Sequence, residues 1–300
     1  MKHLLITIAA VLLAGCDKSK KSTPAADAIP VDPITEAANS EVPSISIHDA
    51  VLKSKFGSEV LKEIYFQMIR QHLAAGTDVN TLNNFGETPL DLAECEIADF
   101  ILKNGGKTSV WLRADESIHL AAEAGHIEAV KKHLASGADV NGKDKDELND
   151  GFTPLHHAAY EGHKKLIEII IASGANINVG TEKRGAPLNT AVGMGLIDCV
   201  ELLINLGANL NEKDGEGWTA LHLSSYSGKI DIVKLLIDKG ANVNAKDDIY
   251  GTPLDLAERD WEDSANEDDS PEDKANKKET ADLLRKHGGK TAEELKAEGK

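Results

Sequence analysis

The sequence predicts an all-α repeat solenoid, in which pairs of helices stack on one another in chain order. The first observation is a five-residue motif, Gly-Ala-(Asp or Asn)-x-Asn, at 137–141, 174–178, 207–211 and 240–244, with a looser copy at 76–80. The second is its spacing, because the four close copies follow at intervals of 37, 33 and 33 residues. The third is that each interval reads as a short apolar-periodic helix, a glycine turn and a second helix. A fixed period of this length indicates a solenoid whose neighbouring units share one core.

The N-terminal residues are typical of a secretory signal. The apolar run from Leu4 to Gly15 is 12 residues long, whereas a membrane-spanning helix needs about 20. Lys2 precedes the run and small residues close it, so we assign residues 1–15 to a cleaved signal peptide. The tetrapeptide Leu13-Ala14-Gly15-Cys16 resembles the lipobox of bacterial lipoproteins, which implies cleavage before Cys16 and acylation of that residue. An ordinary signal peptide with an incidental cysteine is the alternative.

Residues 16–44 are expected to be a lipidated N-terminus followed by a disordered tether. Four prolines stand here among alanine, serine, lysine and acidic residues, and such a composition cannot bury enough apolar surface to fold. A flexible chain of this length spans about 30 Å. We therefore expect an exported protein that its lipid holds on a bacterial membrane, facing the periplasm or the exterior. Asp17 resembles the signal that retains lipoproteins of enteric bacteria in the inner membrane, which is the expected location if that rule applies.

Two long segments of the chain repeat one pattern of residues. They are FTPLHHAAYEGHKKLIEIIIASGANIN (152–178) and WTALHLSSYSGKIDIVKLLIDKGANVN (218–244). The period, the Thr-(Pro or Ala)-Leu-His motif and the glycine-terminated loop resemble the ankyrin repeat. The resemblance covers about residues 46–291 and implies seven helix–turn–helix units with hairpin loops, beginning near Ser46, Phe85, Arg113, Gly151, Gly185, Gly217 and Gly251.

Individual positions in these units have physical roles that can be predicted. Thr153 and Thr219 precede apolar helices, where a hydroxyl oxygen can accept hydrogen bonds from free backbone N–H groups. Pro154 falls at the first helical position, where a missing N–H is tolerated. Cys199 lies inside the apolar stretch LIDCVELLI and is expected to be a small core residue. Because Cys95 lies three units away, we expect no disulfide between the two.

Some units depart from the common pattern. Units two and seven carry TPLDLAE and end in Gly-Gly-Lys-Thr, at 105–108 and 288–291, where the glycine pair is expected to end a helix. This form predicts two tandem arrays, 45–109 with two units (the first divergent) and 110–295 with five, followed by a tail at 296–300. Unit five carries Ala186 and Asn189 where threonine and histidine are expected, which puts its loop hydrogen bonds in doubt.

Composition and motifs argue against several classes of function. The net charge is −17, from 50 acidic and 33 basic residues, so a nucleic-acid phosphate backbone would repel the chain. Gly-Gly-Lys-Thr lacks the first glycine of a P-loop and follows a helix instead of a strand. His156, His157 and His163 could suggest a metal site, but the resemblance implies structural roles for histidines in these motifs, at positions 48, 119, 126, 156, 163 and 222. We expect no enzyme activity, cofactor, metal or small-molecule substrate.

An acidic insert, assigned to 258–279, interrupts the last unit. Residues 258–273 hold nine carboxylates and one basic residue, Arg259. A solvated, disordered loop is the simplest interpretation. A docking loop for a basic partner or a weak Ca²⁺ site is the alternative, although the calcium-loop spacing is absent, and Trp261 is the one residue that a solubilising loop would not need.

The resemblance also implies a partner surface, because ankyrin arrays bind proteins through loop tips and the exposed ends of their first helices. By position, the candidates on helix ends are Tyr160, Glu161, Met194 and Tyr226, and those at loops are Lys183, Arg184, Asp214, Trp218 and Tyr250. Tyrosine and tryptophan are preferred anchors of interfaces, although Trp218 and Tyr250 could equally pack against an adjacent loop. The predicted function is a membrane-anchored interaction scaffold or regulator for an unidentified protein. The alternatives are a passive tether, an enzyme or a metal-binding protein.

Overall fold

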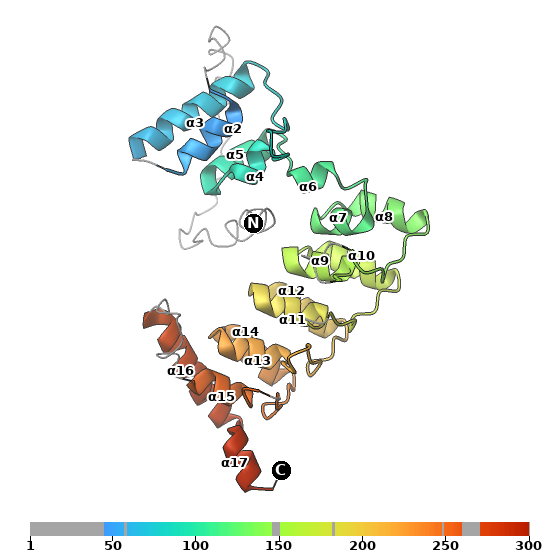
Figure 1. Ribbon diagram of the computed structural model, residues 1–300, viewed down its shortest axis with the longest axis vertical. Helices are drawn as coiled ribbons and strands as arrows, with labels where there is room; N and C mark the ends of the chain where they lie inside the picture. Colours follow the sequence, from blue (N-terminus) through green and yellow to red (C-terminus); the bar gives the residue numbers. More distant parts are fainter. Residues whose placement is uncertain are drawn as a thin grey trace, which may run out of the picture. The chain divides into compact units, whose positions relative to one another are not determined.

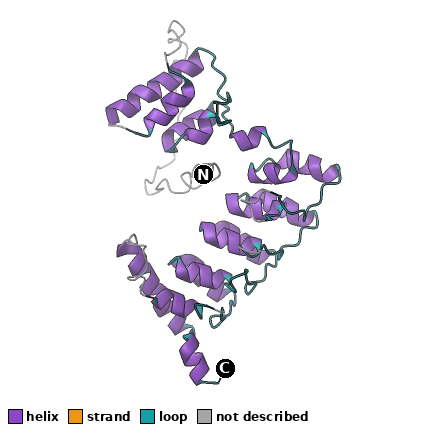
Figure 2. Ribbon diagram, in the orientation of Figure 1, coloured by secondary structure: helices purple, strands orange, loops and turns teal. Residues whose placement is uncertain are grey.

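The computed structural model describes residues 45–56, 59–145, 151–181, 184–247, 249–259 and 271–299 (Figure 1). The chain divides into two compact units, Met1–Arg113 and Ala114–Lys300. Every regular element of the described ranges is a helix and none is a strand (Figure 2), which confirms the prediction of an all-α solenoid. No helix in these ranges combines the length and hydropathy needed to cross a bilayer. The signal peptide, Cys16, the tether and Trp261 lie outside the described residues.

The first unit contains the first two predicted repeats. Its helices are α2 (Ile47–Ser54), α3 (Glu59–Ala74), α4 (Pro89–Leu92), α5 (Cys95–Lys103) and α6 (Ser109–Leu112). Helix α2 packs against α3 and α4, and α4 packs against α5. Their core includes Val51, Ile69 and Ile101, each 0 % exposed.

The second unit contains the other five predicted repeats. Its helices are α7 (Ile118–Glu123), α8 (Ile127–Ala135), α9 (Pro154–Glu161), α10 (Lys164–Ala172), α11 (Pro187–Met194), α12 (Ile197–Asn205), α13 (Ala220–Tyr226), α14 (Ile230–Asp238), α15 (Pro253–Glu258), α16 (Pro271–Lys286) and α17 (Ala292–Ala297). Helices α7, α9, α11, α13 and α15 contact one another in order and form one layer, and α10, α12, α14 and α16 form a second (Figure 1). Each of the four repeats from α9 to α16 supplies one helix to each layer, and α8 packs against α7.

Two predicted boundaries need correction in this unit. Helix α16 begins at Pro271, so residues 271–279 of the predicted insert belong to a helix. Helix α17 runs to Ala297, so it crosses the predicted boundary between the last array and the tail. The sequence of α17 is short and polar, which is why its helical pattern is weak when read alone.

Helices α9 and α13 start at the threonines that the sequence predicts as N-caps. Thr153 is the N-cap of α9 with an extended backbone (φ −88°, ψ 167°), and Pro154 is the first helical residue. Thr219 has the same role before α13. Gly162 ends α9 with φ +81°, a left-handed conformation that side chains with a Cβ adopt only at a cost.

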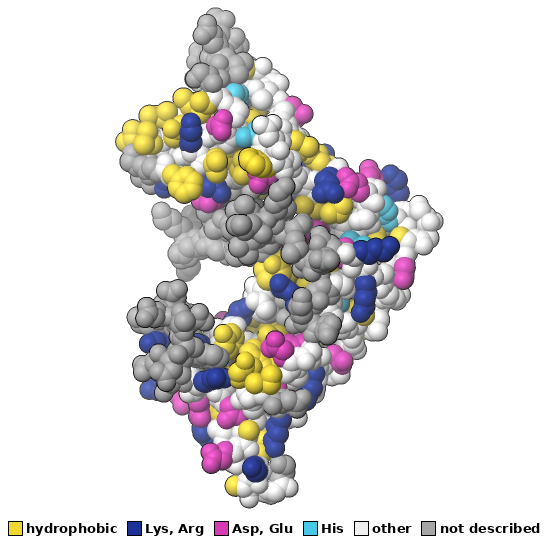
Figure 3. Space-filling model, in the orientation of Figure 1, with side chains coloured by type: hydrophobic (Ala, Val, Ile, Leu, Met, Phe, Trp, Pro, Cys, Tyr) yellow, Lys and Arg dark blue, Asp and Glu magenta, His cyan; other side chains and the backbone are white. Residues whose placement is uncertain are grey.

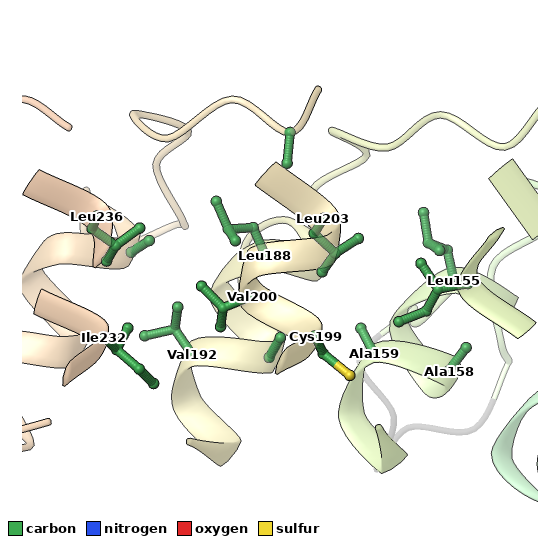
Figure 4. Close-up of a cluster of buried hydrophobic side chains, with 14 of the residues drawn as sticks. Leu155, Ala158, Ala159, Leu188, Val192, Cys199, Val200, Leu203, Ile232 and Leu236 are labelled. Carbon is green, nitrogen blue, oxygen red and sulfur yellow. The ribbon is translucent and has the colours of Figure 1, made fainter. Parts of the chain in front are cut away.

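The core of the second unit lies between the two helix layers, and each repeat contributes to it (Figure 4). Leu155, Leu188, Val200, Leu203 and Leu236 are all 0 % exposed. Core side chains of adjacent repeats point toward one another across the boundary between the two repeats (Figure 4). No repeat can therefore bury its apolar face alone. Cys199 is free and 2 % exposed within this core, as predicted. Burial raises the pKa of its thiol to about 11.

A ladder of asparagine side chains joins the loops of successive repeats. The backbone N–H of Asn176 donates to Oδ1 of Asn141 (2.7 Å), and that of Asn209 donates to Oδ1 of Asn178 (2.8 Å). In the same way, the backbone N–H of Asn242 donates to Oδ1 of Asn211 (2.9 Å). In each Gly-Ala-Asn-x-Asn loop, the backbone N–H of the first asparagine therefore donates to the preceding loop. The side-chain Oδ1 of the last asparagine accepts from the following loop.

The Gly-Gly-Lys-Thr loops end these ladders. Lys107 donates its N–H to Asn80 Oδ1 (2.7 Å) and Lys290 donates to Asn244 Oδ1 (2.8 Å). At the position of the last asparagine, however, these loops carry Ser109 and Ala292, whose side chains have no carboxamide oxygen to accept a bond from a further loop. The glycine pairs also end α5 and α16, with Gly105 at φ +82° and Gly288 at φ +83°, in agreement with the expected caps.

Candidate protein-interaction surface

A histidine in the first turn of the first helix fixes the loop that follows the repeat, whether it stands in a Ser-Ile-His or a Thr-x-x-His sequence. Nε2 of His48 bonds to the carbonyl of Thr81 (2.9 Å), that of His119 to Gly142 (2.8 Å) and that of His222 to Gly251 (3.3 Å). These are structural roles, as the sequence led us to expect. The loop held by His222 carries one candidate interface residue, Tyr250.

His156 shows the chemistry of this position most completely. The N–H of Thr153 donates to Nδ1 (3.2 Å), so Nδ1 carries no proton and Nε2–H donates to the carbonyl of Gly185 (3.0 Å). The Thr153 hydroxyl also bonds to Nδ1 (2.9 Å). Burial lowers the pKa of His156 to about 4, so the ring is neutral at physiological pH.

Asn189 replaces this histidine in the fifth repeat. Its Nδ2 reaches the carbonyl of Trp218 at 3.4 Å, the long end of hydrogen bonding, and its Oδ1 has no partner although it is buried. Ala186, in the place of the threonine, offers no side-chain cap to α11. The shorter amide side chain thus makes the weaker loop contact that the sequence indicated.

An acidic cluster surrounds His157, which projects from α9. Nε2 of His157 lies 3.1 Å from Asp144 Oδ2, and Nδ1 lies 4.0 Å from Glu123 Oε2. Glu161, a candidate from the sequence, is a half-buried residue one turn further along α9. Burial, reinforced by the negative charge of Glu123, raises the pKa of Glu161 to about 8. At neutral pH this carboxyl group is therefore mainly protonated and can donate a hydrogen bond.

Tyr160, also on α9, lies in a second cluster beside these carboxyl groups. Its ring centroid is 6.2 Å from that of Phe152. The guanidinium carbon of the exposed Arg184 lies 5.7 Å from the Phe152 ring centroid and 5.6 Å from that of Tyr160. The structure thus brings together two predicted residues, Tyr160 and Arg184, through Phe152, which the sequence analysis did not single out. Lys183, the neighbour of Arg184, lies outside the described residues.

Three further candidates form an aromatic cluster around Trp218. Its ring centroid is 5.4 Å from that of Tyr226 and 5.7 Å from that of Tyr250, the latter in an edge-to-face arrangement. Arg259 lies over Tyr250 at 4.9 Å, and Lys277 lies 5.8 Å from the Tyr226 ring. Neither cation contact could be predicted from the sequence, because an insert separates Arg259 and Lys277 from the motif positions.

The three rings differ in accessibility. Trp218 is 9 % exposed, which matches the alternative that it packs against neighbouring loops. Tyr250 is 37 % exposed and Tyr226 is half-buried, so both remain available to a partner. Asp214 supports the same loop, because its Oδ1 accepts hydrogen bonds from the N–H groups of Glu216 (3.0 Å) and Trp218 (2.8 Å). Burial raises the pKa of Asp214.

Met194, the remaining candidate, is half-buried at the C-terminal end of α11. By repeat position this helix lies between α9, which carries Tyr160, and α13, which carries Tyr226. The candidates of the second unit therefore lie on three consecutive helices of one layer and on the loops that precede α11, α13 and α15.

The described residues contain no group of three or more His, Cys, Asp and Glu side chains placed to hold a metal ion.

The fold and this surface define a class of protein, the helical repeat solenoids that present loops and helix ends to other molecules. The family model for ankyrin repeats (3 copies) matches residues 94–181, 118–214, 180–247 and 206–259, together more than half of the chain. The chain belongs to the ankyrin-repeat family, whose members generally mediate protein–protein interaction and are typically not enzymes. No curated protein matches the chain as a relative.

Proposed function

We propose that this chain is an exported, lipid-anchored ankyrin-repeat protein that binds a protein partner through α9, α11, α13 and their loops. The observation that carries the proposal is the pair Tyr160 and Tyr226. They occupy equivalent positions two repeats apart, both are half-buried, and each has a basic side chain beside its ring. Amphipathic rings held by their neighbours lose little conformational freedom on binding, so they suit the centre of an interface.

Crosslinking in living cells, followed by mass spectrometry, tests the binding surface. The double variant Tyr160→Ala/Tyr226→Ala is compared with wild type and with Tyr65→Ala, a matched control because Tyr65 is a half-buried tyrosine of the first unit. We expect one protein to be captured by wild type and the control and lost from the double variant. Identical captures from all three strains would reject the surface. A passive tether predicts no specific capture at all.

The anchor is tested separately through Cys16. The lipobox and the tether composition support acylation at this residue. Metabolic labelling with a fatty-acid analogue should mark the wild type and leave Cys16→Ser unmarked. Equal labelling of the two chains, or none in either, would reject the anchor and leave the binding surface untouched. The membrane that holds the protein follows from the fraction in which the labelled chain sediments.

A further inference from the structure

The first unit exposes a group of large apolar side chains that no interaction described above uses. Leu52, Phe56, Val60, Leu61 and Ile64 are 42 %, 72 %, 70 %, 44 % and 44 % exposed, and we call them the α3 face. They fall within residues 52–64, at the end of α2 and the start of α3, and hydrophobic side chains gather there in Figure 3. Val60, Leu61 and Ile64 are spaced by three and four residues, so they lie on one side of the helix. An exposed cluster of this kind marks an interaction site.

The other end of the chain is built differently. The terminal repeats of a solenoid need a polar outer face, because no further repeat covers them. The last repeat meets this requirement, since no large apolar side chain is exposed in the described part of 271–299. The first repeat does not meet it, so the α3 face is expected to lie against another surface.

The chain outside the described residues indicates which surface this is. Residues 1–44 lead directly into α2, the helix that packs on α3. With the acyl chain of the proposed anchor at Cys16, 28 residues (17–44) separate the lipid from the repeat that carries the α3 face. A flexible segment of that length would span about 30 Å, so the proposed anchor would keep the α3 face at a high effective concentration near the bilayer.

Charge favours the same occupant. Residues 45–113 carry seven Lys and Arg against nine Asp and Glu, a net −2, whereas residues 114–300 carry 22 against 36, a net −14. The stretch 52–64 is itself positive by one charge, with three lysines and two glutamates. Lys53 and Lys62 are exposed beside the apolar side chains. Apolar side chains flanked by lysines suit the interface of a bilayer that contains anionic lipid.

We propose that the α3 face lies on the lipid surface, with Phe56, Val60, Leu61 and Ile64 in the headgroup and upper acyl region. The proposal rests on the anchor proposed above, and it assigns a second membrane contact to the protein.

Fluorescence quenching in vesicles tests this contact. The full lipidated chain, carrying Phe56→Trp or Ile249→Trp, is reconstituted into vesicles of phosphatidylethanolamine and phosphatidylglycerol with brominated acyl chains. Ile249 is a matched control because it is 68 % exposed in the second unit. After subtraction of the wild-type signal, we expect the emission of the tryptophan at 56 to fall about twofold or more and that at 249 to stay constant.

The outcomes separate the two proposals. Flotation with the vesicles reports the anchor, and quenching at position 56 reports the α3 face. A chain that floats without quenching at 56, or with equal quenching at 56 and 249, overturns the lipid contact and leaves the anchor standing. A chain that does not float overturns both.

A second variant addresses the other possible occupants. In a Cys16→Ser chain, whose vesicle binding depends on the α3 face alone, Val60→Ser/Ile64→Ser should weaken binding to the same vesicles about tenfold. Ile197→Ser/Leu206→Ser in the same chain, at sites 40 % and 39 % exposed in the second unit, should leave this binding unchanged. If wild type is instead a dimer in detergent and the first variant a monomer, a second copy covers the α3 face and the lipid contact is overturned.

Discussion

Glu161 is a residue whose surroundings change its protonation state. Its pKa of about 8 in the folded chain lies above the ordinary 4.5 because of burial and the adjacent Glu123. A raised pKa means that the folded state holds this proton more tightly than the unfolded state does. The resulting stability is fully present below pH 4.5 and is lost as the pH rises through about 8.

The variant Glu161→Gln should therefore have a stability difference that depends on pH. Glutamine keeps the shape and cannot ionise, so we expect its Tm to equal that of wild type near pH 5 and to exceed it by a few degrees near pH 9. Thermal denaturation monitored by circular dichroism at the two pH values measures this. Glu168→Gln, an exposed site on α10, serves as control. A difference independent of pH would show that Glu161 is ionised throughout.

At the residue scale, the sequence indicated where the candidate residues lie better than it indicated which side chains they contact. Tyr160 and Glu161 could be assigned from the repeat register, because every first helix exposes the same two positions. The contact of His157 with Asp144 could not, since Asp144 lies in the enlarged loop 142–150 that has no counterpart in the other repeats. The burial of Trp218 depends on Tyr226 and Tyr250 together, which lie eight and 32 residues further along the chain.

At the scale of elements, the exchange of histidine for aspartate in Thr-Pro-Leu-Asp has a structural cause. In Thr-Pro-Leu-His repeats the side chain donates to the carbonyl of a following loop. Asp255 Oδ2 instead accepts from the N–H of Thr252 and of Ala292, the first residue of α17, each at 2.8 Å. Asp91 accepts the N–H of Ser109, the first residue of α6, at 3.0 Å. Aspartate is present where a helix start, with its free N–H groups, follows the repeat.

Asp255→His should release α17 from the last repeat. The imidazole would present its own N–H to the N–H of Ala292, so the contact is lost at a cost of about 1–3 kcal/mol. Hydrogen exchange measured by mass spectrometry should show faster exchange in residues 292–297 and no change in α9 to α12. The reciprocal variant His222→Asp places a carboxylate against the Gly251 carbonyl and should destabilise its own loop. Unchanged exchange in α17 would contradict this account.

The elements that the sequence indicated well were those with a repeated pattern. Helices α9 to α14 match the expected units because caps, apolar spacing and loop motifs agree. The short helices α6 and α17 were not anticipated, since four and six residues carry too little periodicity to be recognised. The extra turns at the start of α16 were missed because polar residues there resemble a solvated insert.

At the scale of the whole molecule, the two compact units each have a separate core. The chain divides after Arg113, and the hydrophobic cores on either side share no residue. The Gly-Gly-Lys-Thr loop at 105–108 ends the asparagine ladder of the first unit. The division predicted from the sequence, after residue 109, was inferred from the same loop. The sequence alone could not show that the two parts have separate cores.

Calorimetry should therefore show two unfolding transitions. Ile69→Ala and Leu203→Ala each remove a fully buried side chain, one from each unit, at a cost of about 2–5 kcal/mol. Each variant is expected to lower the temperature of one transition and to leave the other in place. If both variants lower a single common transition, the two units unfold as one cooperative body.

The direction of the asparagine ladder limits how such a gene can lengthen. Interior repeats are interchangeable at their joints, because each offers a donor to the loop before it and an acceptor to the loop after it. A duplicated repeat inserted between the fourth and the sixth could form the loop hydrogen bonds to both of its neighbours. A repeat added beyond Gly-Gly-Lys-Thr would find no acceptor, so length variation among descendants of this gene is expected inside the arrays and not after their Gly-Gly-Lys-Thr loops.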